Sequence, residues 1–201
     1  MGNFPKRTYW VEDNRYSLTD YAREKIRRQV SEADGYLVSS LCESGRHAPV
    51  LDFDFSVEVS ENILIFSKLV TVDKAYGLFE ALAECGFIGE NEKCSVGLER
   101  FTLRDYHEKI PFSFSVKLDA PFRLIASSTA GHCHLYIDRE VSWLQYKKLL
   151  VRFTEAGLIE GNYYRLCAKH EKGFLLKPGV TKDDIREMQK RGTVSPRYFV
   201  Y

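Results

Sequence analysis

Two short segments of this chain alternate ionisable residues with large apolar ones, and they constrain the fold more than any other feature. The first carries Asp52 and Asp54 in an apolar run, and the second carries His132 and His134 after a small, hydroxyl-rich turn. Because strand side chains repeat every two residues, each pair shares one face of its strand. Burying ionised carboxylates without a partner costs several kcal/mol or more. A divalent metal ion is the obvious compensating partner.

An internal repeat at an offset of 71 residues gives the second constraint. Residues 71–86 and 142–157 each hold a Thr or Ser N-cap, a helix of about three to four turns and a Gly at the helix C-terminus. Strand-like sequence follows each unit, at 94–103 and 163–176. We therefore expect an α+β fold with helices on one face of a sheet, built from two related strand-helix-strand-strand units. Chance recurrence of helices between strands is the alternative explanation of the repeat.

The chain is long enough to bury a core as one domain. It has 201 residues, of which 44% are hydrophobic, and no linker rich in Pro, Gly or Ser divides it. We expect a single domain over 1–201, with an N-terminal helix at 17–33, a core at 36–178, and a charged C-terminal helix and tail at 179–201.

Charge and cysteine content narrow the class of protein. The 29 Lys and Arg nearly cancel the 28 Asp and Glu, so no global field draws the chain to nucleic acid or membranes, and any such contact is local. The five cysteines show no metal-ligand spacing, and we expect reduced thiols. No signal peptide and no apolar run of about 18 residues is present. These features predict a cytoplasmic protein without a membrane partner.

The hydroxyl-rich turn and nearby basic residues indicate a phosphate ligand. Backbone amides of such a turn approach an anion closely, and imidazoles on the next strand reach phosphate oxygens. Residues 165–197 carry nine Lys or Arg against four Asp or Glu, which fits a nucleic-acid groove or an ordinary solvated surface. The expected nucleotide-binding residues are Ser128, Thr129, Gly131, His132, Arg46 and Arg123.

The order of these motifs resembles the archaeo-eukaryotic primase-polymerase superfamily. An Asp-x-Asp strand, here Asp52 and Asp54, precedes a Ser/Thr-Gly turn that leads into His134-Leu-Tyr. The resemblance implies an RNA-recognition-like antiparallel sheet, Mg²⁺ or Mn²⁺ on the two aspartates, and His134 on the triphosphate of a nucleotide. These three residues would be catalytic in an active enzyme. The implied partner is a nucleotide triphosphate or single-stranded nucleic acid such as DNA, and the compact size fits a phage or mobile-element protein.

The family's third motif, a further Asp on a later strand, has no clear counterpart. Asp119 precedes the His motif, and Asp138 follows it too closely. Without a third carboxylate, nucleotidyl transfer by two metal ions has less support than binding of a nucleotide or nucleic acid. Two alternatives stay open. One is a non-enzymatic interaction protein with a structural Asp/His network, and the other is a small metal-dependent phosphoesterase in which His132 and His134 ligate zinc or manganese.

Overall fold

A computed structural model describes the central part of the chain and isolated positions beyond it. The described residues are 7–10, 37–89, 102, 104, 107, 109–127, 129–176, 183, 184, 187 and 190. The expected helix at 17–33, most of the segments 94–103 and 179–201, and Ser128 of the turn lie outside the described residues.

The described elements combine strands and helices, which confirms the α+β class. The strands form three antiparallel sheets of three strands, in the orders β1-β2-β9, β3-β8-β7 and β4-β5-β6, rather than one continuous sheet. No described helix has both the length and the apolar character needed to cross a membrane. The elements are β1 Arg7–Trp10, β2 Leu37–Cys42, β3 Val50–Phe53, β4 Val57–Ser60, β5 Ile63–Thr71, α2 Val72–Glu84, β6 Pro111–Lys117, β7 Phe122–Ala126, β8 Cys133–Ile137, α4 Trp143–Glu155, α5 Gly161–His170 and β9 Phe174–Leu176.

The 71-residue repeat is present in the structure as two equivalent helices. Helices α2 and α4 begin and end at positions that differ by 71, after the N-caps Thr71 and Ser142. Gly86 and Gly157 follow them with φ of +67° and +71°, the left-handed conformation that favours glycine at a helix end. The two helices therefore end in the same way, whereas at their N-termini only the Ser142 side chain accepts a hydrogen bond from a helix amide.

The second unit departs from the expected strand-helix-strand-strand order. The segment 163–176 was expected to be strand-like, but most of it belongs to α5, and only β9 is a strand. Tyr163 and Cys167 lie one helical turn apart, and Cys167 is fully buried. Burial of this helical face outweighs the strand preference of the aromatic residues, because strand propensity depends strongly on context.

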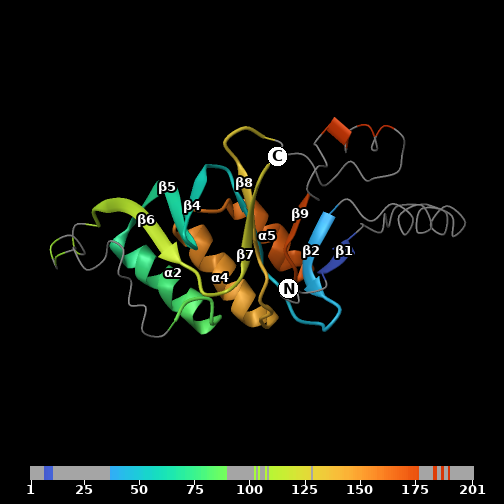
Figure 1. Ribbon diagram of the computed structural model, residues 1–201, viewed down its shortest axis with the longest axis horizontal. Coiled ribbons are helices and arrows are strands. Elements are labelled where there is room, and N and C mark those ends of the chain that lie inside the picture. Colours follow the sequence, from blue (N-terminus) through green and yellow to red (C-terminus); the bar gives the residue numbers. More distant parts are fainter. Residues whose placement is uncertain are drawn as a thin grey trace, which may run out of the picture.

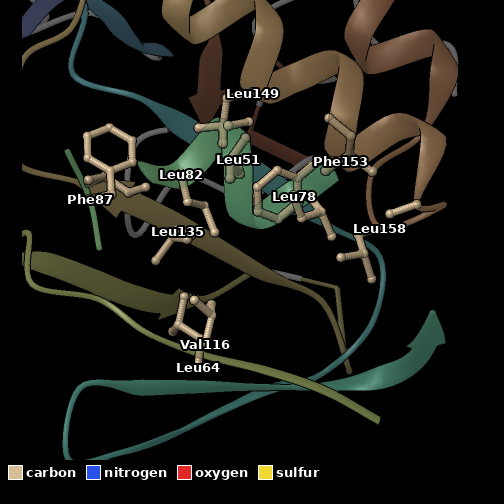
Figure 2. Close-up of a cluster of buried hydrophobic side chains, with 14 of the residues drawn as sticks. Leu51, Leu64, Leu78, Leu82, Phe87, Val116, Leu135, Leu149, Phe153 and Leu158 are labelled. Carbon is tan, nitrogen blue, oxygen red and sulfur yellow. The ribbon is translucent and has the colours of Figure 1, made fainter. Parts of the chain in front are cut away.

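The main core lies between the helices and one face of the strands. In Figure 1, α2 and α4 lie side by side, with β4, β5 and β6 toward one end of the molecule and β1, β2 and β9 toward the other. Figure 2 shows Leu51 of β3 and Leu135 of β8 in the cluster that also holds residues of both helices. Since neighbouring strand residues alternate faces, Asp52 and His134 project from the opposite face.

Four of the cysteines lie in the described part of the chain, where all four are buried and none is in a disulfide. Their burial is typical of cysteines that act as small apolar side chains in a core. They are Cys42, Cys85, Cys133 and Cys167.

Candidate functional site

Antiparallel pairing of β3 with β8 brings the predicted acidic and imidazole residues together. Asp52 stands directly opposite His134, and its Oδ1 lies 3.4 Å from the His134 Nε2. In the bend just after β3, the Asp54 Oδ1 lies 3.0 Å from the His132 Nδ1. The pairing of β3 with β8 therefore creates two Asp-His pairs, one within the strands and one just beyond their ends, which neither segment would provide alone.

The four side chains differ in their access to solvent. The Asp52 and Asp54 side chains are 38% and 41% exposed, whereas those of His132 and His134 are 28% and 10% exposed. His134 is covered because β8 is the central strand, with β3 on one side and Ile125 of β7 on the other. The carboxylates are open to a ligand from solution, and His132 is the more accessible of the two imidazoles.

The donor separations fit a divalent ion. Two donors that each lie about 2.1 Å from one ion, at an angle of about 90–110°, are about 3.0–3.4 Å apart. The Asp52–His134 separation of 3.4 Å is longer than an N–H···O hydrogen bond but matches this geometry. The Asp54–His132 separation of 3.0 Å fits both a hydrogen bond and a shared ion.

The protein supplies two donors to each candidate ion position. Among the described residues, no group of three or more His, Cys, Asp or Glu side chains is arranged to hold a metal. Mg²⁺ and Mn²⁺ commonly bind through one or two carboxylates, with water and substrate phosphates as the remaining ligands. Asp52 and Asp54 therefore fit an ion that a phosphate ligand completes.

The hairpin turn between β7 and β8 uses several of its amides internally. The Ser127 amide donates to the His132 carbonyl at 3.0 Å, and the His132 amide donates to the Thr129 carbonyl at 3.1 Å. Gly131 closes the turn with φ of +77°. The backbone bonds described for this turn do not use the amides of Ala130 and Gly131, both exposed residues. The Thr129 amide lies 3.4 Å from the Ser127 hydroxyl, to which it donates. Among the described amides of the turn, those of Ala130 and Gly131 are therefore the ones that we expect to contact an anion.

The two arginines expected at the site contact other groups. Arg123 donates from Nε and Nη2 to the Asp138 carboxylate at 2.9 and 3.0 Å, and the Asp138 side chain is only 1% exposed. Arg46 donates from Nη2 to the Glu140 carbonyl at 3.3 Å, beyond the end of β8 that is farther from His132. Arg123 therefore neutralises a buried carboxylate, and Arg46 lies at the other end of the sheet from the Asp-His pairs.

Two tyrosines bind the backbone of β3 two residues before Asp52, and this role was not predicted from the sequence. The hydroxyls of Tyr146 in α4 and Tyr163 in α5 donate to the Val50 carbonyl at 2.6 and 2.9 Å. The Val50 amide lies 3.3 Å from the Tyr146 hydroxyl, to which it donates. A usable signal is present in the sequence, because a buried tyrosine needs a hydrogen-bond partner and an edge strand has backbone groups to offer.

His47 lies outside the site in a buried network of its own. Its Nδ1 is 3.2 Å from the Ser40 hydroxyl, which accepts a bond from the Gly173 amide at 2.9 Å. The ring of Trp143 packs 5.3 Å from the imidazole, centre to centre. Burial lowers the pKa of His47, as does nearby Lys172, whereas the charge of Glu171 opposes that shift. This histidine is built into the core.

Comparison of the chain with models of known protein families, with curated proteins and with solved structures gives no significant match. The resemblance to primase-polymerases therefore rests on the two motifs, and the chemistry of the site is argued from the chain's own residues.

Proposed function

We propose that this chain binds a nucleotide triphosphate, alone or at the end of a nucleic-acid strand, through a divalent ion held by Asp52 and Asp54. The observation that carries the proposal is the pair of adjacent Asp-His contacts on β3 and β8, open to solvent and next to a glycine turn. His134 lies 3.4 Å from the Asp52 carboxylate and His132 lies 3.0 Å from the Asp54 carboxylate, so each imidazole can serve an ion or a phosphate oxygen beside its own aspartate. The exposed amides of the turn add uncharged donors for phosphate.

Ion and phosphate binding should depend on each other. Two carboxylates repel a triphosphate, and unit charges about 4 Å apart interact by about 1 kcal/mol in water and about 4 kcal/mol near a protein surface. A divalent ion between them reverses the sign of this interaction and supplies the charge neutralisation that phosphate chemistry needs. Conversely, with two protein donors per ion, the ion binds weakly until phosphate oxygens complete its coordination.

Binding, rather than nucleotidyl transfer, is the activity that the described residues support best. The Asp138 carboxylate is engaged by Arg123, and Asp119 lies in the turn after β6, where its amide donates to the Phe87 carbonyl. Among the described residues, no third carboxylate forms a metal-binding group with Asp52 and Asp54. A cytoplasmic location belongs to the same proposal, because free, buried cysteines fit a reducing compartment that also contains nucleotides.

The test is a titration of a fluorescent nucleoside triphosphate with and without Mn²⁺. We expect binding that requires Mn²⁺ in the native protein and is at least about tenfold weaker, equivalent to about 1.4 kcal/mol, when Asp52→Asn and Asp54→Asn are combined. Asp119→Asn is the matched control, because it removes an exposed carboxylate on a different element, and it should bind like the native protein. A parallel titration with a labelled single-stranded oligonucleotide distinguishes a strand from a free nucleotide.

Equal affinity in the double variant and the native protein would refute the ion site. The structural-network alternative predicts a different pattern, in which Asp52→Asn lowers the melting temperature while Mn²⁺ and nucleotide leave the native melting temperature unchanged. A ligand that binds only the folded state must raise the melting temperature, by an amount that grows with its concentration. The two functions are thus separated by one set of melting curves.

A further inference from the structure

We propose that Tyr163 is a positioning residue that holds Asp52 in place for the ion. The inference rests on the proposed function in naming the ion, but the structural effect on Asp52 is independent of it. Its basis is the hydroxyl contact between Tyr163 on α5 and the backbone of β3, two residues before Asp52.

The contact lies at the open edge of a sheet. β3 is the outer strand of its sheet, so backbone groups on one side have no strand partner in the β3-β8-β7 order. The Val50 carbonyl accepts from both Tyr146 and Tyr163, at 2.6 and 2.9 Å, which ties the strand to two different helices. Because backbone groups of residues i and i+2 point to the same side of a strand, the backbone of Asp52 faces this edge as well.

The charge of Asp52 acts on two residues of α5. Burial raises the pKa of Tyr163 well above its ordinary value, and the negative charge of Asp52 contributes to that shift. Burial likewise raises the pKa of Cys167 to about 12, with a smaller contribution from Asp52. Cys167 lies one helical turn from Tyr163, so both residues that feel this charge lie on the same side of α5.

The Tyr163 ring and its hydroxyl have separable roles. The ring packs against both buried clusters of the molecule and would remain in a Tyr163→Phe variant. The Val50 carbonyl would keep its bond from Tyr146, so no acceptor is left unpaired. The variant loses the hydrogen bond from Tyr163 of α5 to the Val50 carbonyl of β3, two residues before Asp52. The expected defect is therefore in the position of Asp52 rather than in the fold.

The direct test is the ring ¹⁵N spectrum of the histidines in the metal-free protein. Asp52 contacts His134, and Asp54 contacts His132, so the two imidazoles report separately on the two carboxylates. Tyr163→Phe should shift the His134 Nε2 signal and leave the His132 signal in place. Tyr164→Phe is the matched control, because Tyr164 is the neighbouring partly buried tyrosine, and it should move neither signal.

A second measurement connects the effect to the ion. In Tyr163→Phe the Mn²⁺ dissociation constant, measured with nucleotide present, should rise on the order of tenfold, as is usual when a group that orients a metal ligand is removed. The melting temperature should fall by about 2–4 °C. If Tyr163→Phe does not fold, 3,5-difluorotyrosine at this position keeps the side chain, changes the strength of the hydroxyl donor, and should still shift the His134 signal.

An unchanged His134 signal in Tyr163→Phe, or equal shifts at both histidines, would overturn the positioning role. Failure of the proposed function gives a different result. In that case the His134 signal still moves, but Mn²⁺ and nucleotide bind neither the native protein nor the variant.

Discussion

Gly173 is a position where one added methyl group should destabilise the fold strongly. It precedes β9 and lies against the fully buried Tyr146, and a Cβ atom added there would sit 1.9 Å from the Tyr146 hydroxyl oxygen and 2.9 Å from its Cζ. Both distances are shorter than real contacts, so in Gly173→Ala either the phenol or the backbone must move by about 1 Å or more. Moving the phenol breaks its two contacts with the Val50 backbone. Moving the backbone strains the two bonds between Gly173 and Ser40.

The size of the effect follows from these contacts. Overpacking a well-packed core costs about 1–3 kcal/mol, and a buried backbone group that loses its partner costs about 1–3 kcal/mol more. We expect Gly173→Ala to lower the free energy of unfolding by about 3–5 kcal/mol. For a chain of this size, that corresponds to a fall in melting temperature of about 10–15 °C.

Urea unfolding of a double-mutant cycle measures the prediction. Tyr146→Phe removes the oxygen that the new methyl group meets, so Gly173→Ala should cost about 1–3 kcal/mol less in that background than in the native one. Gly161→Ala is the matched control, because a Cβ at Gly161 meets nothing within 4 Å, and its cost should lie within about 0.5 kcal/mol of zero. A Gly173→Ala variant as stable as native protein, or additive costs in the cycle, would refute the reasoning.

Two further predictions concern pH and helix capping. Because burial lowers the pKa of His47 from its ordinary 6.5, the contribution of His47 to stability should be complete above about pH 6.5 and lost as the pH falls toward the lowered value. Urea unfolding at pH 5 and 7.5 should therefore show a smaller pH effect in His47→Gln than in the native protein. An identical pH effect in the two proteins would contradict this prediction. Ser142→Ala should lower the free energy of unfolding by about 1 kcal/mol, as measured by thermal melts, and Thr71→Ala by clearly less. Of these two hydroxyls, only that of Ser142 accepts a hydrogen bond from a helix amide, whereas that of Thr71 donates to Asp73. Equal losses of stability would contradict the capping assignment.

Sequence patterns predicted those features that depend on local chemistry. Strand alternation predicted one common face for Asp52 and Asp54 and another for His132 and His134, and in the structure Asp54 and His132 lie just beyond the strands, each next to its partner. Helix caps and terminal glycines predicted both helices of the 71-residue repeat, since capping depends on neighbouring residues alone. Both kinds of pattern are complete within a few positions of the chain, and together they were sufficient for the α+β class.

Only the tertiary structure decided which side chains from distant parts of the sequence contact each other. Which aspartate faces which histidine depends on the register between β3 and β8, and the burial of His134 depends on β7 covering its other side. The pairing of Arg123 with Asp138 could not be predicted from the sequence, and it forms because a buried carboxylate without a partner is costly. Tyr163 lies in helix α5 rather than in the expected strand, and its hydroxyl donates to the edge strand β3. Packing between α5 and β3 outweighs the preference of tyrosine for a strand. The sequence by itself determined the local elements and the types of side chain at the candidate site, while long-range packing decided which of those side chains meet.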